Sequence, residues 1–102
     1  MDLNLKNKVI IVSGGSSGIG RGISICLAKE GAIPYILGRN KANIVSVISE
    51  IEKEGGQAGY AFAELTDPQK CKEAVDSCIA RFGRIDGLVN NAGVNDSVGL
   101  ED

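Results

Sequence analysis

Short apolar runs that end in glycine or asparagine constrain this 102-residue chain more than any other feature. The first run, Val9 to Val12, is wholly apolar and β-branched, and Ser13-Gly14-Gly15 follows it directly. A run without polar alternation predicts a strand that is buried on both faces, which is typical of a parallel sheet. We therefore expect helices to cover this sheet.

The same pattern recurs along the chain and predicts three more strands. They are Tyr35 to Leu37, Tyr60 to Phe62 and Leu88 to Val89, and Pro34 opens the second strand, a position where its missing N–H is tolerated. Asp67 and Pro68 predict the start of a helix by N-cap chemistry, and Gly83 predicts its end.

Apolar side chains at helical spacing predict the helices between these strands. The stripes are Ile19, Ile23, Cys26 and Leu27 in the first, Ile44, Val47, Ile48 and Ile51 in the second, and Cys71, Ala74, Val75, Cys78, Ile79 and Phe82 in the third. Alternating strands and helices of this length predict an α/β fold with a doubly wound parallel sheet, four strands and three helices in one domain over residues 1–102. In such a sheet the ligand binds beyond the carboxyl ends of the strands.

Charge and composition narrow the ligand classes. The formal net charge of −2 comes from scattered residues of both signs, which argues against nucleic-acid or anionic membrane partners and favours small molecules. No apolar run approaches the roughly 18 residues of a membrane span, so we expect a cytoplasmic protein. Three cysteines without C-x-x-C spacing and the absence of histidine predict no metal site, and we expect Cys71 and Cys78 to be buried structural thiols.

The loop from Ser13 to Gly20 carries the strongest functional signal, because it follows a strand and opens a helix. Glycine lets the backbone approach a ligand, and a helix N-terminus offers N–H groups and a positive dipole end to a pyrophosphate. The alternative is that these glycines only allow a tight turn. The candidate cofactor-binding residues of this loop are Gly14, Ser16, Ser17, Gly18, Ile19 and Gly20.

The spacing Gly14-x-x-x-Gly18-x-Gly20 resembles the fingerprint of the short-chain dehydrogenase/reductase family, with Ser13 where that family usually has threonine. Asn90-Asn91-Ala92-Gly93 resembles the family's second motif. The resemblance covers the whole chain and implies a Rossmann-type fold in an NAD(P)(H)-dependent oxidoreductase of roughly twice this length. We therefore expect the chain to be the N-terminal cofactor-binding half of an enzyme, incomplete at its C-terminus; the alternative is a short non-catalytic nucleotide-binding module.

The end of the second strand predicts the choice of cofactor, because the adenosine ribose is expected there. Gly38 offers no carboxylate to the ribose hydroxyls, and Arg39 offers a fork of donors to a 2′-phosphate. The sequence therefore favours NADP, with NAD as the alternative, and Arg39 as a solvated surface residue is the competing interpretation.

The family resemblance implies further contacts. Glu64 and Leu65 stand where the family usually has an aspartate and an apolar residue that hold the adenine; glutamate departs from that pattern, and a merely exposed Glu64 stays open. Asn90, Ala92 and Gly93 are expected against the adenosine ribose. Replacing Asn91 is expected to cost stability as much as affinity, because a buried amide left unpaired is expensive.

The family's catalytic residues find no match in this chain. The resemblance implies a tyrosine with a lysine four residues on, together with a serine and an asparagine, but neither Tyr35 nor Tyr60 is followed by such a lysine. We therefore expect no catalytic residue in these 102 residues. The stretch from Asn90 to Glu101 is similar to sugar dehydrogenases acting on fucose-like aldoses, with 3-oxoacyl carrier-protein reductases as the alternative, and the intact protein is expected to form a homo-oligomer.

Overall fold

The computed structural model describes residues 4–63 and 66–91, which form seven elements in strict alternation. They are β1 (Val9–Ser13), α1 (Gly18–Lys29), β2 (Ile33–Gly38), α2 (Lys41–Lys53), β3 (Gly59–Phe62), α3 (Pro68–Phe82) and β4 (Gly87–Asn90). Every predicted strand and helix is present, with strand bounds that differ by one or two residues. Residues 92–102 lie outside the described part of the chain.

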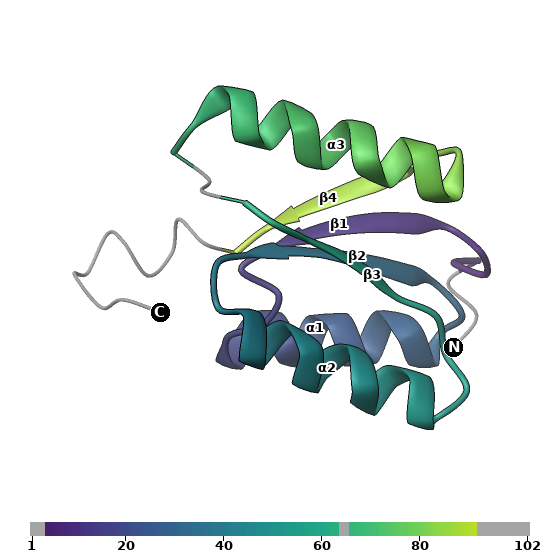
Figure 1. Ribbon diagram of the computed structural model, residues 1–102. Coiled ribbons are helices and arrows are strands. Elements are labelled where there is room, and N and C mark those ends of the chain that lie inside the picture. The colour runs from purple at the N-terminus through teal and green to yellow at the C-terminus, as the bar shows by residue number, and fades with distance from the viewer. Residues whose placement is uncertain (1–3, 64–65, 92–102) are drawn as a thin grey trace.

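All four strands are parallel and lie in the order β3-β2-β1-β4. Helices α1 and α2 cover one face of the sheet and α3 covers the other (Figure 1). The loops that leave β1 and β2 for their helices lie together at the carboxyl edge of the sheet, on the left of Figure 1. This arrangement confirms the predicted doubly wound α/β fold.

Two apolar clusters hold the layers together. Beneath α3, Tyr35 packs edge-to-face against Phe82 with ring centroids 6.0 Å apart, and Cys78 is fully buried. Burial raises the pKa of the Cys78 thiol, and the predicted buried cysteine is confirmed there. The prediction is wrong for Cys71, which is only half-buried on α3. On the other face, Ile36 packs with the apolar stripe of α2. None of the helices in the described part of the chain is long and apolar enough to span a membrane.

Strand β2 begins at Ile33, so Pro34 is its second residue and not its first. The Ile33 N–H donates to the Lys8 carbonyl on the β1 side, so the nitrogen of Pro34 faces the β3 side of the strand. Strand β3 begins at Gly59, opposite Tyr35, and therefore does not reach Pro34. The proline removes no ladder hydrogen bond at this position.

The predicted stripe of α1 is wrong in part. Ile19 is 65% exposed and Cys26 is exposed, whereas the buried residues of this helix are Gly20 and Ser24. Helix α1 approaches the sheet through small residues, so the hydrophobic pattern alone predicted the wrong buried face of this helix. The stripe of α2 is confirmed, and that of α3 holds except at Ile79, which is 47% exposed.

Candidate nucleotide-binding site

The loop between β1 and α1 is braced around the carbonyl of Gly14. Gly14 has a φ of 74°, which favours glycine, and its N–H donates to the Leu37 carbonyl at 2.9 Å. The Ser17 hydroxyl and the Ser17 N–H both donate to the Gly14 carbonyl, at 3.0 and 3.3 Å. The loop is therefore held both by Ser17 and by the neighbouring strand β2.

Two glycines of the motif differ in what surrounds them. A Cβ on Gly20 would lie 2.0 Å from the Gly14 carbonyl oxygen, so only glycine fits where α1 crosses the loop. A Cβ on Gly18 would meet nothing within 4 Å. Gly20 is thus required by packing, whereas Gly18 borders open space at the start of α1.

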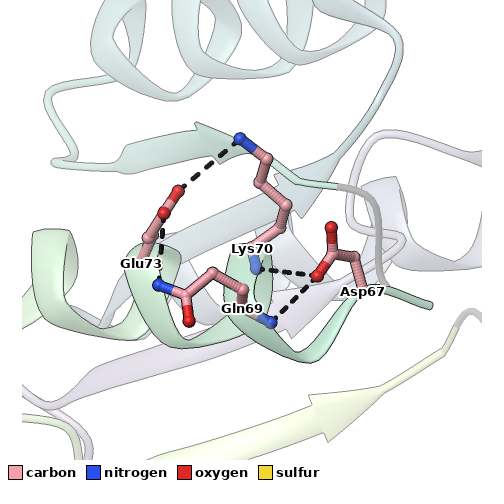
Figure 2. Close-up of polar contacts among 4 residues, drawn as sticks. All are labelled: Asp67, Gln69, Lys70 and Glu73. Carbon is pink, nitrogen blue, oxygen red and sulfur yellow. Dashed lines mark hydrogen bonds and ion pairs between the residues drawn. The ribbon is translucent and has the colours of Figure 1, made fainter.

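The N-termini of the three helices are satisfied differently. Asn40 caps α2 by accepting from the Asn43 N–H at 3.0 Å. Asp67 caps α3 by accepting from the N–H groups of Gln69 and Lys70, at 3.0 and 3.4 Å (Figure 2). At α1 the N-cap residue, Ser17, makes no side-chain cap hydrogen bond.

An uncapped helix start at the carboxyl edge of the sheet is suited to an anion. The first N–H groups of a helix have no intrahelical acceptor, and the helix dipole places partial positive charge there. The first turn of α1 contains no acidic residue, so no fixed carboxylate competes for these donors. The geometry can therefore accept the oxygens of a phosphate or pyrophosphate.

The fourth strand brings its asparagines to this loop. The Ser13 hydroxyl donates to Asn90 Oδ1 at 3.0 Å, and the buried Asn91 donates from its N–H to the Ser13 carbonyl and from Nδ2 to the Gly14 carbonyl, at 3.2 and 3.5 Å. Asn90 and Asn91 therefore tie β4 to β1 and to the loop. Ala92 and Gly93, also predicted to bind cofactor, lie outside the described residues.

The end of β2 lies beside the same loop. A Cβ on Gly38 would sit 3.6 Å from Ser16 Oγ and 3.5 Å from Ile44 Cδ1, which are ordinary contact distances. Arg39 follows as an exposed residue before Asn40, so the structure brings its backbone to the edge of the predicted site. Glu64 and Leu65 lie outside the described residues.

Sequence reasoning missed the internal bracing of the site. Ser17 is among the predicted cofactor-binding residues, yet its hydroxyl donates to the Gly14 carbonyl within the loop. The hydrogen bond from Ser13 to Asn90 joins residues 77 positions apart, and no local sequence pattern predicts such a pair. The adjacency of two motifs at strand ends in a parallel sheet was the available signal, since such ends meet at one edge.

Curated relatives match most of this chain. A short-chain dehydrogenase/reductase of Cladobotryum is 41% identical over 102 residues, covering 97% of this chain and 39% of the relative. The 3-oxoacyl-[acyl-carrier-protein] reductase of Thermotoga maritima is 36% identical over 92 residues, covering 90% and 37%. The chain thus spans less than half the length of these relatives.

Solved structures match the fold closely. A hydroxysteroid dehydrogenase of Escherichia coli superposes with a TM-score of 0.84 at 36% identity, over 87% of this chain and 38% of that one. An NADH-dependent reductase in complex with NAD gives 0.82 at 31% identity, covering 90% and 38%. An actinorhodin polyketide ketoreductase with NADPH gives 0.80 at 29%, covering 84% and 33%.

The sequence match extends beyond individual relatives. The family model described as short chain dehydrogenase matches residues 8–102, which include both the glycine loop after β1 and the asparagine motif at the end of β4. With the parallel sheet, the braced glycine loop and the β4 asparagines in place, this match establishes the family. The chain belongs to the short-chain dehydrogenase/reductase family.

Proposed function

We propose that the glycine loop and the ends of β2 and β4 bind the ADP-ribose half of a nicotinamide dinucleotide. The observation that carries this proposal is the α1 N-terminus, which has no side-chain cap and stands beside the open space at Gly18. The loop is already braced, so little ordering would be needed on binding. Family membership supports the same assignment.

Each predicted contact then has a role. The N–H groups at the start of α1 hold the pyrophosphate, with Ile19 and Gly20 in the first turn and Ser16 in the loop before it. Asn90 orients the ribose side of the site through Ser13. The family resemblance assigns Glu64 and Leu65 to the adenine, and Ala92 and Gly93 to the ribose.

We infer that the cofactor is NADP. Gly38 leaves the end of β2 without a carboxylate that would repel a 2′-phosphate, and Arg39 is exposed directly after it. The similar structures do not distinguish NADP from NAD, because one is a complex with NAD and another with NADPH. NAD is therefore the alternative that the experiment must exclude.

Replacing Arg39 by alanine tests this choice. We expect the Kd for NADP to rise by about 10-fold or more and the Kd for NAD to stay nearly constant, because a charge-assisted contact is lost only for the 2′-phosphate. Titration calorimetry with both dinucleotides measures the two values. Lys41→Ala is the matched control, since it removes a cation two residues away whose Nζ lies over the Phe62 ring. Equal losses for both cofactors would contradict the assignment.

We further propose that hydride transfer between an alcohol and a carbonyl requires residues beyond this chain. When bound, the dinucleotide supplies the hydride donor or acceptor. Tyr35 is buried and its hydroxyl is bound to Ser77, and Tyr60 lies on the end strand β3, so the geometry of neither supports a catalytic role at the glycine loop. The chain alone should therefore bind dinucleotide without turnover, and turnover with any alcohol or carbonyl would overturn this.

The substrate is proposed at the level of class. An aldose follows from the resemblance of residues 90–101 to sugar dehydrogenases, and a 3-oxoacyl thioester is the second candidate because a reductase of that name is 36% identical. A survey of aldoses and acyl substrates with the intact natural protein separates the two. The mass of that protein tests whether residues 1–102 are one cofactor-binding domain of a longer enzyme or a short non-catalytic module.

A further inference from the structure

The outer edge of β3 carries an exposed aromatic pair. Within the described sheet β3 is an end strand, and its Tyr60 and Phe62 are 40% and 45% exposed with ring centroids 5.1 Å apart. The Nζ of Lys41 lies 5.8 Å from the centroid of the Phe62 ring. The pair lies outside the glycine-loop site and takes no part in the proposed function.

The backbone of the same two residues faces outward. The Ala63 N–H donates to the Gly38 carbonyl of β2 at 2.9 Å. Because hydrogen-bonding direction alternates along a strand, Ala61 also faces β2, whereas the N–H and C=O groups of Tyr60 and Phe62 point to the open edge. The edge therefore offers two donors and two acceptors together with two rings.

This edge lacks most of the features that prevent end strands from pairing with another chain. Strand β3 reads Gly-Tyr-Ala-Phe, with no charged residue and no proline, and its shortness is its one protection. Tyr60 pairs in register with Ile36 of the α2-side cluster, so both rings lie on the α2 face of the sheet. An added strand would find hydrogen-bonding groups and apolar surface at the same place.

We propose that β3 pairs with β3 of a second copy of this chain, antiparallel about a two-fold axis through Ala61. Tyr60 would then exchange both backbone hydrogen bonds with Phe62 of the second copy, and Phe62 with Tyr60 of that copy, giving four bonds. Residues directly opposite in an antiparallel pair share a face, so the four rings would gather on one side. The edge is thus complementary to itself, as a two-fold interface requires.

Charge favours a second copy over an unrelated extended peptide. Lys41 lies at the Phe62 end of the edge, and the two-fold operation brings it beside Tyr60 of the second copy, where its cation can face another ring. The two Lys41 residues fall at opposite ends of the paired strands and do not face each other. Because the contact is small against the roughly 1,200–2,000 Å² of a stable interface, we expect a weak dimer that depends on concentration.

Sedimentation equilibrium of the full chain tests this pairing. A background substitution, Leu88→Lys, places a charge on β4, the other end strand of the described sheet, where Leu88 is 67% exposed, and so disfavours association through β4. We expect dimers in this background, weakened at least about 10-fold by Tyr60→Lys or by Phe62→Pro. Proline at 62 removes an outward N–H and spares the bonds to β2. Ile79→Lys, on exposed α3 surface, should leave the dimer unchanged.

A gain-of-contact variant keeps the test decisive if a β3 substitution unfolds the chain. Ala61 would face Ala61 of the second copy as a non-hydrogen-bonded pair, with Cα atoms about 4.5 Å apart, within the range of a disulfide. Ala61→Cys, with the exposed Cys26 replaced by serine, should form a covalent dimer under mild oxidation, and the chain with Cys26→Ser alone should not. A monomer at all concentrations, failure to cross-link, or a dimer that survives both β3 variants would overturn the proposal.

Discussion

Helices α1 and α3 begin at the same edge of the same sheet, yet a side chain caps the N-terminus of α3 and none caps that of α1. At α3, the Asp67 carboxylate accepts two backbone N–H groups, and Lys70 and Gln69 contact Glu73 one turn on (Figure 2). At α1, the Ser17 hydroxyl turns back to the Gly14 carbonyl and leaves the helix start uncapped. The α3 terminus is satisfied by its own side chain, whereas the first N–H groups of α1 receive no side-chain cap.

Under the proposed function, this difference separates a structural helix start at α3 from a binding one at α1. A capped terminus gains stability from its own side chain, typically about 1 kcal/mol. An uncapped one gives up that stabilisation and recovers it when an anion binds. Substitutions at the two termini should therefore divide into effects on affinity and effects on stability.

The largest effect is expected at Gly20, where α1 crosses its own loop. Gly20→Ala would place a Cβ against the Gly14 carbonyl, so we expect a loss of about 3 kcal/mol or more in unfolding free energy, at the upper end for overpacking, and loss of dinucleotide binding. Urea unfolding measures the first quantity. Gly22→Ala is the matched control, since its Cβ meets nothing within 4 Å, and it should raise helix stability by up to about 1 kcal/mol. Similar outcomes for the two variants would contradict the packing role.

Gly18→Val should greatly weaken binding without unfolding the chain. Its side chain would enter the open space assigned to the pyrophosphate, so we expect affinity to fall by about 100-fold, equivalent to about 2.7 kcal/mol. The unfolding midpoint should change little, because no neighbour is displaced. Gly14→Val should also lose binding, with an added backbone cost at its positive φ. Unchanged affinity for Gly18→Val would show that the loop is only a turn.

Ser17→Asp gives α1 an N-cap carboxylate like the one that Asp67 provides at α3. A carboxylate at the N-cap should stabilise the helix while repelling the cofactor phosphates, so we expect about 10-fold weaker dinucleotide binding at equal or higher stability. Ser17→Asn is the control, because it can cap without charge. If both variants bound the cofactor as well as the parent does, the α1 terminus would not be the phosphate site.

Asp67→Ala removes the N-cap carboxylate of α3. We expect a loss of about 1 kcal/mol in unfolding free energy, because the Gln69 and Lys70 N–H groups lose their acceptor. Dinucleotide affinity, measured by titration calorimetry, should stay the same. A drop in affinity at unchanged stability would show that Asp67 contacts the dinucleotide and does not act only as a cap. The two helix termini would then not differ in the way proposed.

The smallest effect is expected at the opposite end of the sheet, where Asp86 accepts the Val9 N–H at 2.8 Å. Hydrogen bonds from Arg84, and then from the Val9 N–H, lower the pKa of Asp86. Because the folded pKa lies below the unfolded one, the stabilisation is fully present above pH about 4 and is lost as pH falls through the folded pKa. Asp86→Asn should therefore flatten the acid side of a stability curve and leave binding unchanged; a steeper acid dependence would contradict it.

Much of the molecule could be predicted from its sequence. The run Val9 to Val12 and its successors predicted the parallel sheet because strands buried on both faces admit no polar alternation. Asp67 and Gly83 predicted both ends of α3, since capping chemistry acts within one turn. Family motifs predicted that the glycine loop and the asparagines after β4 lie side by side, because both stand at strand ends.

The buried face of α1 could not be predicted in the same way. Its apolar residues surround much of the helix, and a hydrophobic pattern cannot recognise contacts made through Gly20 and Ser24. The exposed Ile19 and the bond from the Ser17 hydroxyl to Gly14 depend on how closely the helix approaches the loop. Periodicity measures hydrophobicity and carries no information on that distance.

By itself, the sequence determined the order of the elements, the parallel sheet and the family, because all three depend on local chemistry repeated along the chain. Only the tertiary structure decided which glycine is filled by backbone and which borders open space, and that Ser13 and Asn90 meet across 77 positions. It also decided that, among the strands the structure describes, β3 lies at an end of the sheet with its aromatic residues exposed. The physical reason is that close packing and strand adjacency are relations between distant segments, and no single segment encodes them alone.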